Sequence, residues 1–219
     1  MVSSQSLHRV FFCLACLWAC ACGGGEATTC DEVSTPCGRV SSNSLQTADL
    51  LFVADMSGMG AAVSASTGVF THVAIVVREA EPVVYDATPG RGVARCSWSA
   101  WVAQTESPVV AMRLTGGVDT VEVVRRLQTL LGKPYDLCFL PDNDAYYCSE
   151  LVQAVCVDSG GGRLFDGTPM NFLAADGTLP TYWERLFDSL QMAVPQGVEG
   201  TNPSQLAASP LLVRLGLVR

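Results

Sequence analysis

Cys148 lies in a stretch of sequence that suits a nucleophile. It follows three residues of helix-capping type, Asp142, Asn143 and Asp144, and it precedes residues typical of a helix. We therefore expect the thiol near the first turn of this helix, where free N–H groups and the helix dipole stabilise a thiolate. The same N–H groups could bind an oxyanion. A small buried cysteine that only packs is the alternative.

His72 and Asp86 lie on two predicted strands that are joined by a short turn at residues 78–80. This hairpin register places the two side chains directly opposite each other on one face of the sheet, with Cβ atoms about 5 Å apart. A shift of the register by two residues keeps both on that face, whereas a shift by one separates them. A carboxylate beside an imidazole fixes its tautomer and raises its basicity. The alternative is an exposed ion pair worth under about 1 kcal/mol.

Composition excludes several other kinds of chemistry. The 219 residues are 49% hydrophobic and 16% charged, which is typical of a globular protein. A formal net charge of −8 with a single lysine disfavours a nucleic-acid partner. The two histidines, His8 and His72, and the lack of C-x-x-C motifs beyond the leader predict no metal site. No phosphate-binding or dinucleotide-binding loop occurs, so no cofactor is expected.

Apolar patterns predict the elements that must position these residues. Strands are expected at residues 49–54, 70–77, 83–87, 93–96 and 108–114, helices at 97–104, 119–131, 148–157 and 180–192, and a last apolar element at 211–218. Residues 55–69, mostly Gly, Ala, Ser and Met, are expected to form a mobile loop. Because strands come first and helices later, the order indicates an α+β fold with an antiparallel sheet packed against helices.

The N-terminal segment has the pattern of an export signal. A short basic start precedes an apolar run of 12 residues, which is too short to span a bilayer. The end of the run resembles a bacterial lipoprotein signal, and we favour Cys22 over Cys20 as the lipidated residue. Residues 1–21 are thus expected to be a signal peptide, residues 22–47 a tether and residues 48–219 the folded domain. An ordinary secretory leader is the alternative.

Export would also permit disulfide bonds. Cys30 and Cys37 flank a proline-containing loop and could pair, although spacing alone does not establish the bond. Cys156 falls on the same predicted helix as Cys148, and we expect it to be a core residue.

The chain also resembles the permuted papain-like amidases, a YiiX/YebB-like group within the NlpC-type superfamily of cysteine hydrolases. The similar stretches are DLLFV at 49–53, THVAIV at 71–76, YDA at 85–87, LGKPYD at 131–136, YCSELV at 147–152, and GTNP at 200–203 with Ser209-Pro210. His72 precedes Cys148 by 76 residues, which is the permuted order relative to papain. The resemblance implies a papain-like core in which the helix bearing Cys148 packs against the sheet bearing His72.

The resemblance further implies a mechanism. Cys148 attacks a carbonyl as a thiolate, His72 removes its proton and later protonates the leaving group, and Asp86 orients His72. Glutamate is common at the third position in this family, so the shorter Asp86 is a departure. The resulting thioester is hydrolysed or passed to another acceptor. The backbone N–H of Cys148 and a neighbour would bind the oxyanion, with Tyr146 or Tyr147 as further candidates, although both tyrosines equally suit packing.

Three functions remain open at this point. The first is a cell-envelope cysteine hydrolase that cleaves an amide bond, for which cell-wall peptide is an available substrate. The second keeps the fold but acts on lipid acyl esters or amides, as a hydrolase or acyltransferase. The third is a non-catalytic wall-binding lipoprotein. The N-terminal segment predicts that the chain is exported and anchored to the bacterial envelope membrane through its N-terminal lipid, at the outer membrane or facing the periplasm.

Overall fold

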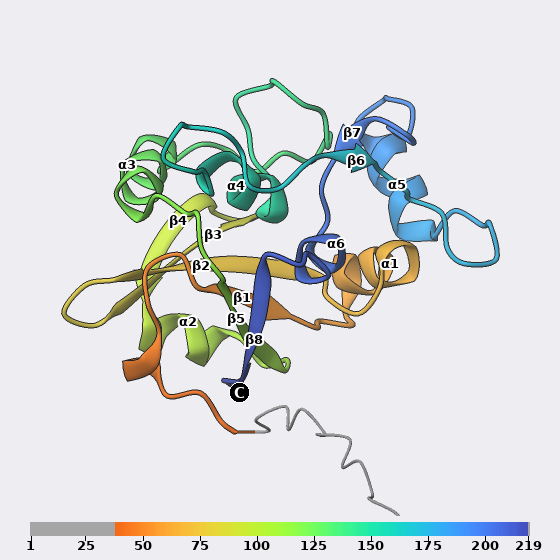
Figure 1. Cartoon of the computed structure of the whole chain (residues 1–219). Coiled ribbons are helices and arrows are strands. Elements are labelled where there is room, and N and C mark those ends of the chain that lie inside the picture. The colour runs from red at the N-terminus through yellow and green to blue at the C-terminus, as the bar shows by residue number, and fades with distance from the viewer. Residues whose placement is uncertain (1–37, 219) are drawn as a thin grey trace, which may run out of the picture. The chain divides into compact units, whose positions relative to one another are not determined.

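The computed structural model describes residues 38–218, in which helices cover a central antiparallel sheet (Figure 1). Six strands lie in the order β4-β3-β2-β1-β5-β8, and each neighbouring pair is antiparallel. These strands are β1 (Leu50–Val53), β2 (His72–Arg78), β3 (Pro82–Thr88), β4 (Gly92–Ser97), β5 (Val109–Leu114) and β8 (Leu212–Leu217). A separate two-stranded sheet pairs β6 (Thr168–Pro169) with β7 (Glu199–Gly200).

The helices surround this sheet. They are α1 (Gly58–Thr67), α2 (Trp98–Gln104), α3 (Thr120–Leu130), α4 (Cys148–Val155), α5 (Thr181–Ser189) and α6 (Pro203–Ala207), with a short 3-10 turn η1 (Ser42–Ser44). Figure 1 shows α3 and α4 on one face of the sheet and α2 on the other. The predicted α+β class is therefore confirmed, together with the predicted strands and the three longer helices at 119–131, 148–157 and 180–192. The last apolar element is a strand, β8.

The sheet separates two apolar layers, which explains why its central strands are nearly continuous apolar runs. Along β1, Leu50 and Phe52 face the layer that contains α3 and α4, while Leu51 and Val53 face the layer that contains Trp101 of α2. Strands covered on both faces lack the alternation of apolar and polar residues seen in half-exposed strands. All four residues of β1 are buried.

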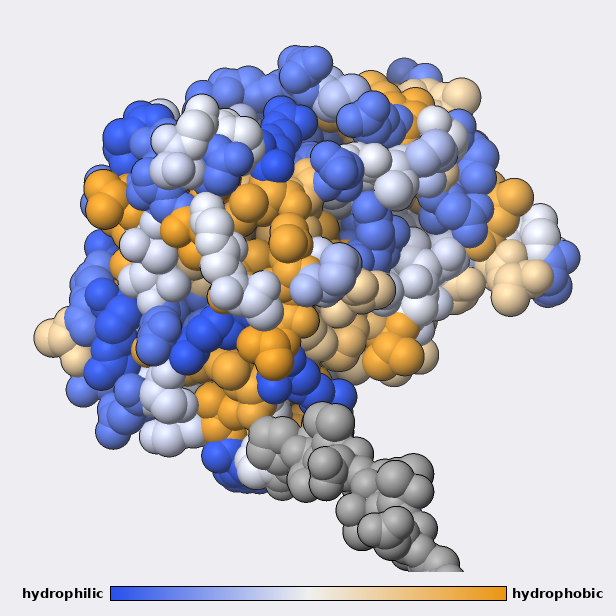
Figure 2. Space-filling model, in the orientation of Figure 1, coloured by the Kyte–Doolittle hydropathy of each residue, from blue (hydrophilic) through white to orange (hydrophobic). Residues whose placement is uncertain are grey.

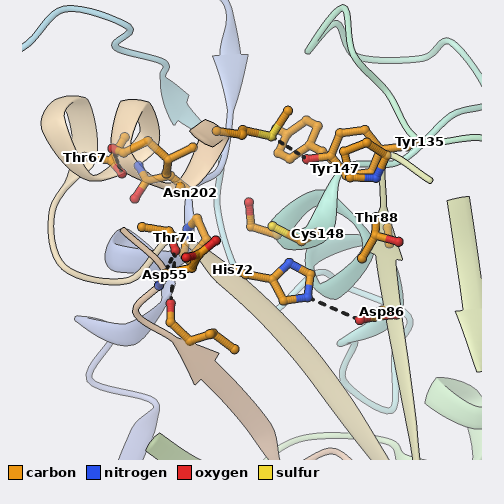
Figure 3. Close-up of a pocket in the computed structure, with 18 of the residues that line it drawn as sticks. Asp55, Thr67, Thr71, His72, Asp86, Thr88, Tyr135, Tyr147, Cys148 and Asn202 are labelled. Atoms are coloured by element: carbon orange, nitrogen blue, oxygen red, sulfur yellow. Dashed lines mark hydrogen bonds and ion pairs between the residues drawn. The ribbon is translucent and has the colours of Figure 1, made fainter. Parts of the chain in front are cut away.

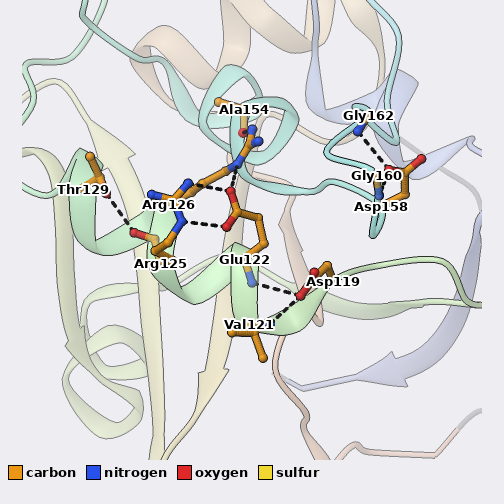
Figure 4. A network of polar contacts seen from close by, with 10 residues as sticks. All are labelled: Asp119, Val121, Glu122, Arg125, Arg126, Thr129, Ala154, Asp158, Gly160 and Gly162. Carbon is orange, nitrogen blue, oxygen red and sulfur yellow. Dashed lines mark hydrogen bonds and ion pairs between the residues drawn. The ribbon is translucent and has the colours of Figure 1, made fainter.

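A polar network fixes α3 against α4 (Figure 4). Asp119 caps α3 by accepting hydrogen bonds from the backbone N–H groups of residues 121 and 122, at 3.1 and 3.0 Å. Within α3, Arg126 donates to Glu122 at 2.8 Å, and its guanidinium also reaches the carbonyl of Ala154 in α4 at 2.9 Å. The helix that begins with Cys148 is thus held at its far end by α3.

The expectation of a mobile loop at residues 55–69 was wrong, because residues 58–67 form α1. Gly, Ser and Ala give this stretch little apolar periodicity, so its helix depends on tertiary packing rather than on local pattern. Ala62 is buried in a third cluster, with aromatic residues near α5. Ser66 donates to the carbonyl of Phe172 at 2.9 Å. Packing against Phe172 and the aromatic residues near α5 therefore stabilises α1 as a helix.

Residues 38–47, expected to belong to the tether, contact the folded part of the chain. The N–H of Val40 donates to the carbonyl of Leu217 at 2.7 Å, and Leu45 is buried in the layer around Trp101. Folded structure therefore begins before residue 48. The predicted signal peptide, the candidate lipidation residues Cys20 and Cys22, and the possible pair Cys30 and Cys37 lie outside the described residues.

The surface of the described region is mixed in polarity. On the face shown in Figure 2, hydrophilic residues predominate in the upper part, over α3 and α4, and apolar residues gather lower down, over the edge strand β8. Val213 and Leu217 of β8 are among the exposed large apolar side chains. Between residues 38 and 218 we find no helix with both the length and the apolar character needed to cross a bilayer.

Phe139 is expected to make a large contribution to stability. Its ring lies within 6.5 Å, between ring centroids, of Tyr135, Tyr147, Phe172, Trp183 and Phe187. Phe139→Ala should lower the free energy of unfolding, measured by urea denaturation, by about 3–5 kcal/mol, because it leaves a cavity among these rings. The control Tyr182→Ala removes a half-buried ring from the same cluster and should cost clearly less. Equal losses of unfolding free energy in the two variants would contradict a central position of Phe139 in this aromatic cluster.

Candidate active site

Cys148 is the first residue of α4, as the sequence predicted. Tyr147 occupies the N-cap position, and because its side chain is a poor cap, Glu150 supplies the polar contact by accepting a hydrogen bond from the Tyr147 N–H at 3.3 Å. The N–H groups of the first turn of a helix have no partner within the helix and point along its axis. The thiol therefore sits where the helix dipole favours negative charge.

The structure corrects the predicted hairpin register. The turn lies at residues 79–81, because Arg78 pairs with Pro82 and Ile75 with Tyr85. Asp86 is consequently opposite residue 74, and the expectation that it lies directly opposite His72 was wrong by two residues. A two-residue shift preserves the face. The side chains still meet diagonally, with 3.4 Å between His72 Nε2 and Asp86 Oδ2.

Asp86 is a buried carboxylate with three donors. Its residue is 3% exposed, and besides His72 it accepts hydrogen bonds from Arg91 at 3.1 Å and from the indole N–H of Trp101 at 3.2 Å. Burial alone would raise the pKa of Asp86, but the hydrogen bond and charge of His72, together with Arg91 and Trp101, lower it below its ordinary value. The carboxylate is therefore ionised at neutral pH.

His72 joins this carboxylate to the thiol. Burial alone would lower the pKa of His72, but hydrogen bonds to Asp86 and Cys148, reinforced by the charges of both, raise it from 6.5 to about 10. Nε2 faces Asp86, which leaves Nδ1 as the ring nitrogen free for the sulfur. Figure 3 shows the imidazole between Cys148 and Asp86. The three predicted residues thus form one continuous polar chain, with an imidazolium at neutral pH.

A cleft of about 590 Å³ opens onto these residues. One part of its wall is apolar and aromatic and comes from α1, α5 and the segments between α3 and β7, namely Met59, Val63, Phe139, Met170, Phe172 and Trp183. Another part is polar and includes Asp55, Thr71 and Asn202. The cleft therefore offers both polar and apolar contacts to a ligand placed against the thiol.

The two tyrosines considered as oxyanion donors have different surroundings. Tyr147 lines the cleft, but its hydroxyl is buried, accepts a hydrogen bond from the N–H of Thr201 at 3.0 Å and contacts the sulfur of Met170 at 3.8 Å. Burial raises the pKa of Tyr147 to about 12. Tyr146 lies in a separate hollow with Glu150 and Arg163 and does not line the cleft.

Tyr135 lines the cleft as well and was not among the predicted donors. Burial, followed by the charge of Cys148, raises the pKa of Tyr135 well above 10, so its hydroxyl keeps its proton. In the structure this hydroxyl contacts the sulfur of Met59 at 3.8 Å, which is a weak acceptor. Tyr135 belongs to the LGKPYD stretch, which lies too far from Cys148 in sequence for a local pattern to place the two together.

The other described cysteines have no comparable setting. Cys156 is fully buried, as predicted, and burial raises the pKa of its thiol to about 12. Cys96 and Cys138 are half-buried and, like Cys148 and Cys156, are free thiols. Neither Cys96 nor Cys138 lines the cleft.

Comparison with known proteins assigns the chain to a family. Residues 44–216 match the family described as permuted papain-like amidase enzyme, YaeF/YiiX, C92 family, and the chain belongs to it. Among individual relatives, the uncharacterized protein YiiX of Escherichia coli K12 is 27% identical over 173 residues, which are 76% of this chain and 84% of that protein.

A solved structure supports the permuted papain-like fold. The crystal structure of metalloprotein yiiX from Escherichia coli O157:H7 superposes with a TM-score of 0.65 at 24% identity, covering 78% of this chain and 96% of that one. Within residues 38–218 of the present chain, no group of three or more His, Cys, Asp or Glu side chains is placed to hold a metal ion.

Replacing Asp86 should lower the pKa of His72. In Asp86→Asn the imidazolium loses its carboxylate while burial still disfavours its charge, so the pKa should fall from about 10 towards 6.5 or below. The pH titration of the imidazole by NMR measures this, with His72→Gln to identify the resonance and the exposed Asp188→Asn as a control. A His72 pKa that stays near 10 in Asp86→Asn would show that the carboxylate does not hold the imidazolium.

Glu150 should make the fold less stable as the pH rises. Burial, together with the carboxylates of Asp136 and Asp142, raises its pKa from 4.5 to about 8. The folded state therefore binds a proton that the unfolded state releases, and stability present below about pH 4.5 is lost as the pH rises through 8. Glu150→Gln keeps the acceptor for Tyr147 and has no proton to lose. Urea denaturation at pH 5 and pH 9 should show a smaller loss in the variant, and equal losses would contradict this assignment.

Proposed function

We propose that this chain is a cell-envelope cysteine hydrolase that cleaves an amide bond through a thioester on Cys148. The observation that carries the proposal is the polar chain of Cys148, His72 and Asp86, which opens into the cleft at the start of α4. The family, described as one of amidases, supports the amide as the bond that is cleaved.

The first half of the reaction forms the acyl-enzyme. The sulfur of Cys148 attacks the amide carbonyl carbon, and the carbonyl oxygen becomes an oxyanion. The imidazolium of His72 then gives its proton to the amide nitrogen, the C–N bond breaks, and the amine leaves. Asp86 keeps the ring oriented and stabilises its positive charge throughout.

The second half releases the acid. His72, now neutral, removes a proton from water, and the hydroxide attacks the thioester carbonyl. The C–S bond breaks, the carboxylic acid departs and the thiolate–imidazolium pair is restored. An acceptor other than water at this step would make the chain an acyltransferase.

Two donors suit the oxyanion. The N–H of Cys148 is at the start of α4, where a backbone N–H has no partner within the helix. The side chain of Tyr135 lines the cleft, and burial keeps its hydroxyl protonated by raising its pKa well above 10. We place Tyr135 in this role in preference to Tyr147, whose hydroxyl is engaged with Thr201.

Lipid acyl esters or amides are a second candidate substrate. The apolar wall of the cleft, which includes Val63, Phe172 and Trp183, could accommodate an acyl chain. A lipid-acting enzyme would release fatty acid from phospholipid or lipoprotein, whereas an amidase would release new amino groups from cell-wall peptide. A wall-binding protein would sediment with peptidoglycan and leave it unchanged.

The leader sequence supports the proposed location. We expect lipidation at Cys22, with Cys20 as the alternative. The mass of the mature N-terminal peptide would identify the modified cysteine.

Loss of the thiol should abolish activity. With purified peptidoglycan, release of amino groups should disappear in Cys148→Ala and fall by about 10²–10⁴-fold in His72→Ala, because the general acid–base is lost. A mass increase on Cys148 during turnover would identify the acyl-enzyme. Fatty-acid release without new amino groups would favour the lipid substrate, and neither product, with retained sedimentation, would favour the binding protein.

The reactivity of the thiol can be measured without a substrate. At pH 6, iodoacetamide should alkylate Cys148 faster than the same cysteine in the denatured chain, and His72→Ala should remove this advantage, because the imidazolium stabilises the thiolate. Site-resolved mass spectrometry gives the rates, with buried Cys156 as an internal control that should not react. A rate like that of the denatured chain, unchanged by the mutation, would refute the Cys–His pair.

A further inference from the structure

One side of the cleft carries a carboxylate that the proposed mechanism does not use. Asp55 follows β1 and lines the same cleft as Cys148 and His72. Figure 3 shows Asp55 and Asp86 on opposite sides of His72. A ligand whose carbonyl lies at the thiol could therefore extend towards Asp55.

The backbone fixes Asp55 beside His72. Its N–H donates to the hydroxyl of Thr71, the residue before His72, at 2.9 Å. The preceding N–H, of Ala54, donates to the carbonyl of Pro108 at 3.2 Å. Glu106, which is exposed, lines the cleft as well.

The carboxylate of Asp55 forms no ion pair in the described part of the chain. Its carboxylate accepts hydrogen bonds from the N–H and hydroxyl of Ser57, at 3.1 and 2.9 Å, and both donors are uncharged. No lysine, arginine or histidine among residues 38–218 forms an ion pair with it. Asp86, in contrast, has both His72 and Arg91. Asp55 is thus available for a cation from outside the chain.

Three buried polar atoms belong to residues that line the cleft but add no contact for a ligand. Within the described residues, three buried side-chain atoms have no hydrogen-bond partner, namely Ser149 Oγ, Trp183 Nε1 and Thr201 Oγ1. All three residues line this cleft. These three atoms have almost no exposed surface, so a ligand in the cleft does not reach them, and the polar character of this side of the cleft depends on Asp55.

We infer that Asp55 is a subsite for a positively charged amino group of the substrate. Charge-assisted hydrogen bonds between an ammonium group and a carboxylate are stronger than those between neutral groups. The favoured substrates are then amino-acid or peptide amides that carry a free amine near the scissile carbonyl, rather than lipid acyl groups. This inference rests on the proposed function, since it places the carbonyl at Cys148.

A matched pair of reagents tests the subsite without requiring turnover. Alanyl chloromethyl ketone carries a free amine, and N-acetylalanyl chloromethyl ketone does not. In both, the sulfur of Cys148 displaces chloride and forms a thioether, which intact-mass spectrometry detects. The measured quantity is the ratio of the two alkylation rates at pH 6.5, divided by the same ratio for the denatured chain.

In the unmodified chain, the normalised alkylation rate of the reagent with a free amine should exceed that of the acetylated reagent by about tenfold or more. This factor is expected for a hydrogen bond between charged groups. Asp55→Asn keeps an oxygen acceptor for Ser57 but removes the charge, and it should bring the ratio close to 1. The matched control is Asp188→Asn, an exposed aspartate of α5 that does not line the cleft, and it should leave the ratio unchanged.

A measurement on the unmodified chain provides an independent check if Asp55→Asn fails to fold. The ratio should decrease as the pH rises through about 8, where an α-amino group loses its charge. A ratio near 1 at pH 6.5, or a high ratio that persists in folded Asp55→Asn, would overturn the subsite. Fast reaction with both reagents alike would overturn it while leaving the proposed function intact. Slow reaction with both, like that of the denatured chain, would contradict the proposed function and the subsite together.

Discussion

The buried carboxylate of Asp86 is the constraint on which the site depends. A charge that is almost fully removed from water must be paired, or it costs several kcal/mol. Its donors, His72, Arg91 and Trp101, come from the start of β2, the turn between β3 and β4, and α2. Satisfying one carboxylate therefore fixes three parts of the fold relative to one another. The same contacts orient the imidazole of His72. The interactions that stabilise this part of the sheet therefore also place the catalytic side chains.

Much of the fold could be predicted because its signals are local. The central strands are apolar runs bounded by turns, and α3 has both an apolar stripe and a capping residue, Asp119. Helix α1 could not be predicted in this way. Its Gly, Ser and Ala residues pack against α5 and Phe172, which lie far along the chain, and no local pattern records such partners. The contact of Leu45 with the layer around Trp101 was missed for the same reason.

The parts of the candidate site that could be predicted are those set by residue type and by the alternation of side chains along a strand. The hairpin turn lies one residue later than expected, yet His72 and Asp86 still share a face, because a two-residue register shift preserves side-chain direction. The start of α4 near Cys148 was predicted correctly, but Asp142, Asn143 and Asp144 do not cap the helix, because the N-cap is Tyr147. Tyr135 and Asp55 were not predicted as site residues, because their place in the cleft follows from how distant segments pack.

The hydrogen bond from Thr201 to the hydroxyl of Tyr147 has a consequence for the order of folding. It links the residue before Cys148 to the segment that leads into α6, and the lining of the cleft extends from Val53 to Pro203. These contacts require residues up to Pro203, so they can form only after that part of the chain has been synthesised. When a nascent chain has been synthesised as far as Cys148, it already contains His72 but still lacks the later residues that line the cleft, up to Pro203. The nucleophile thus acquires its complete surroundings only when nearly the whole domain has been made and has docked.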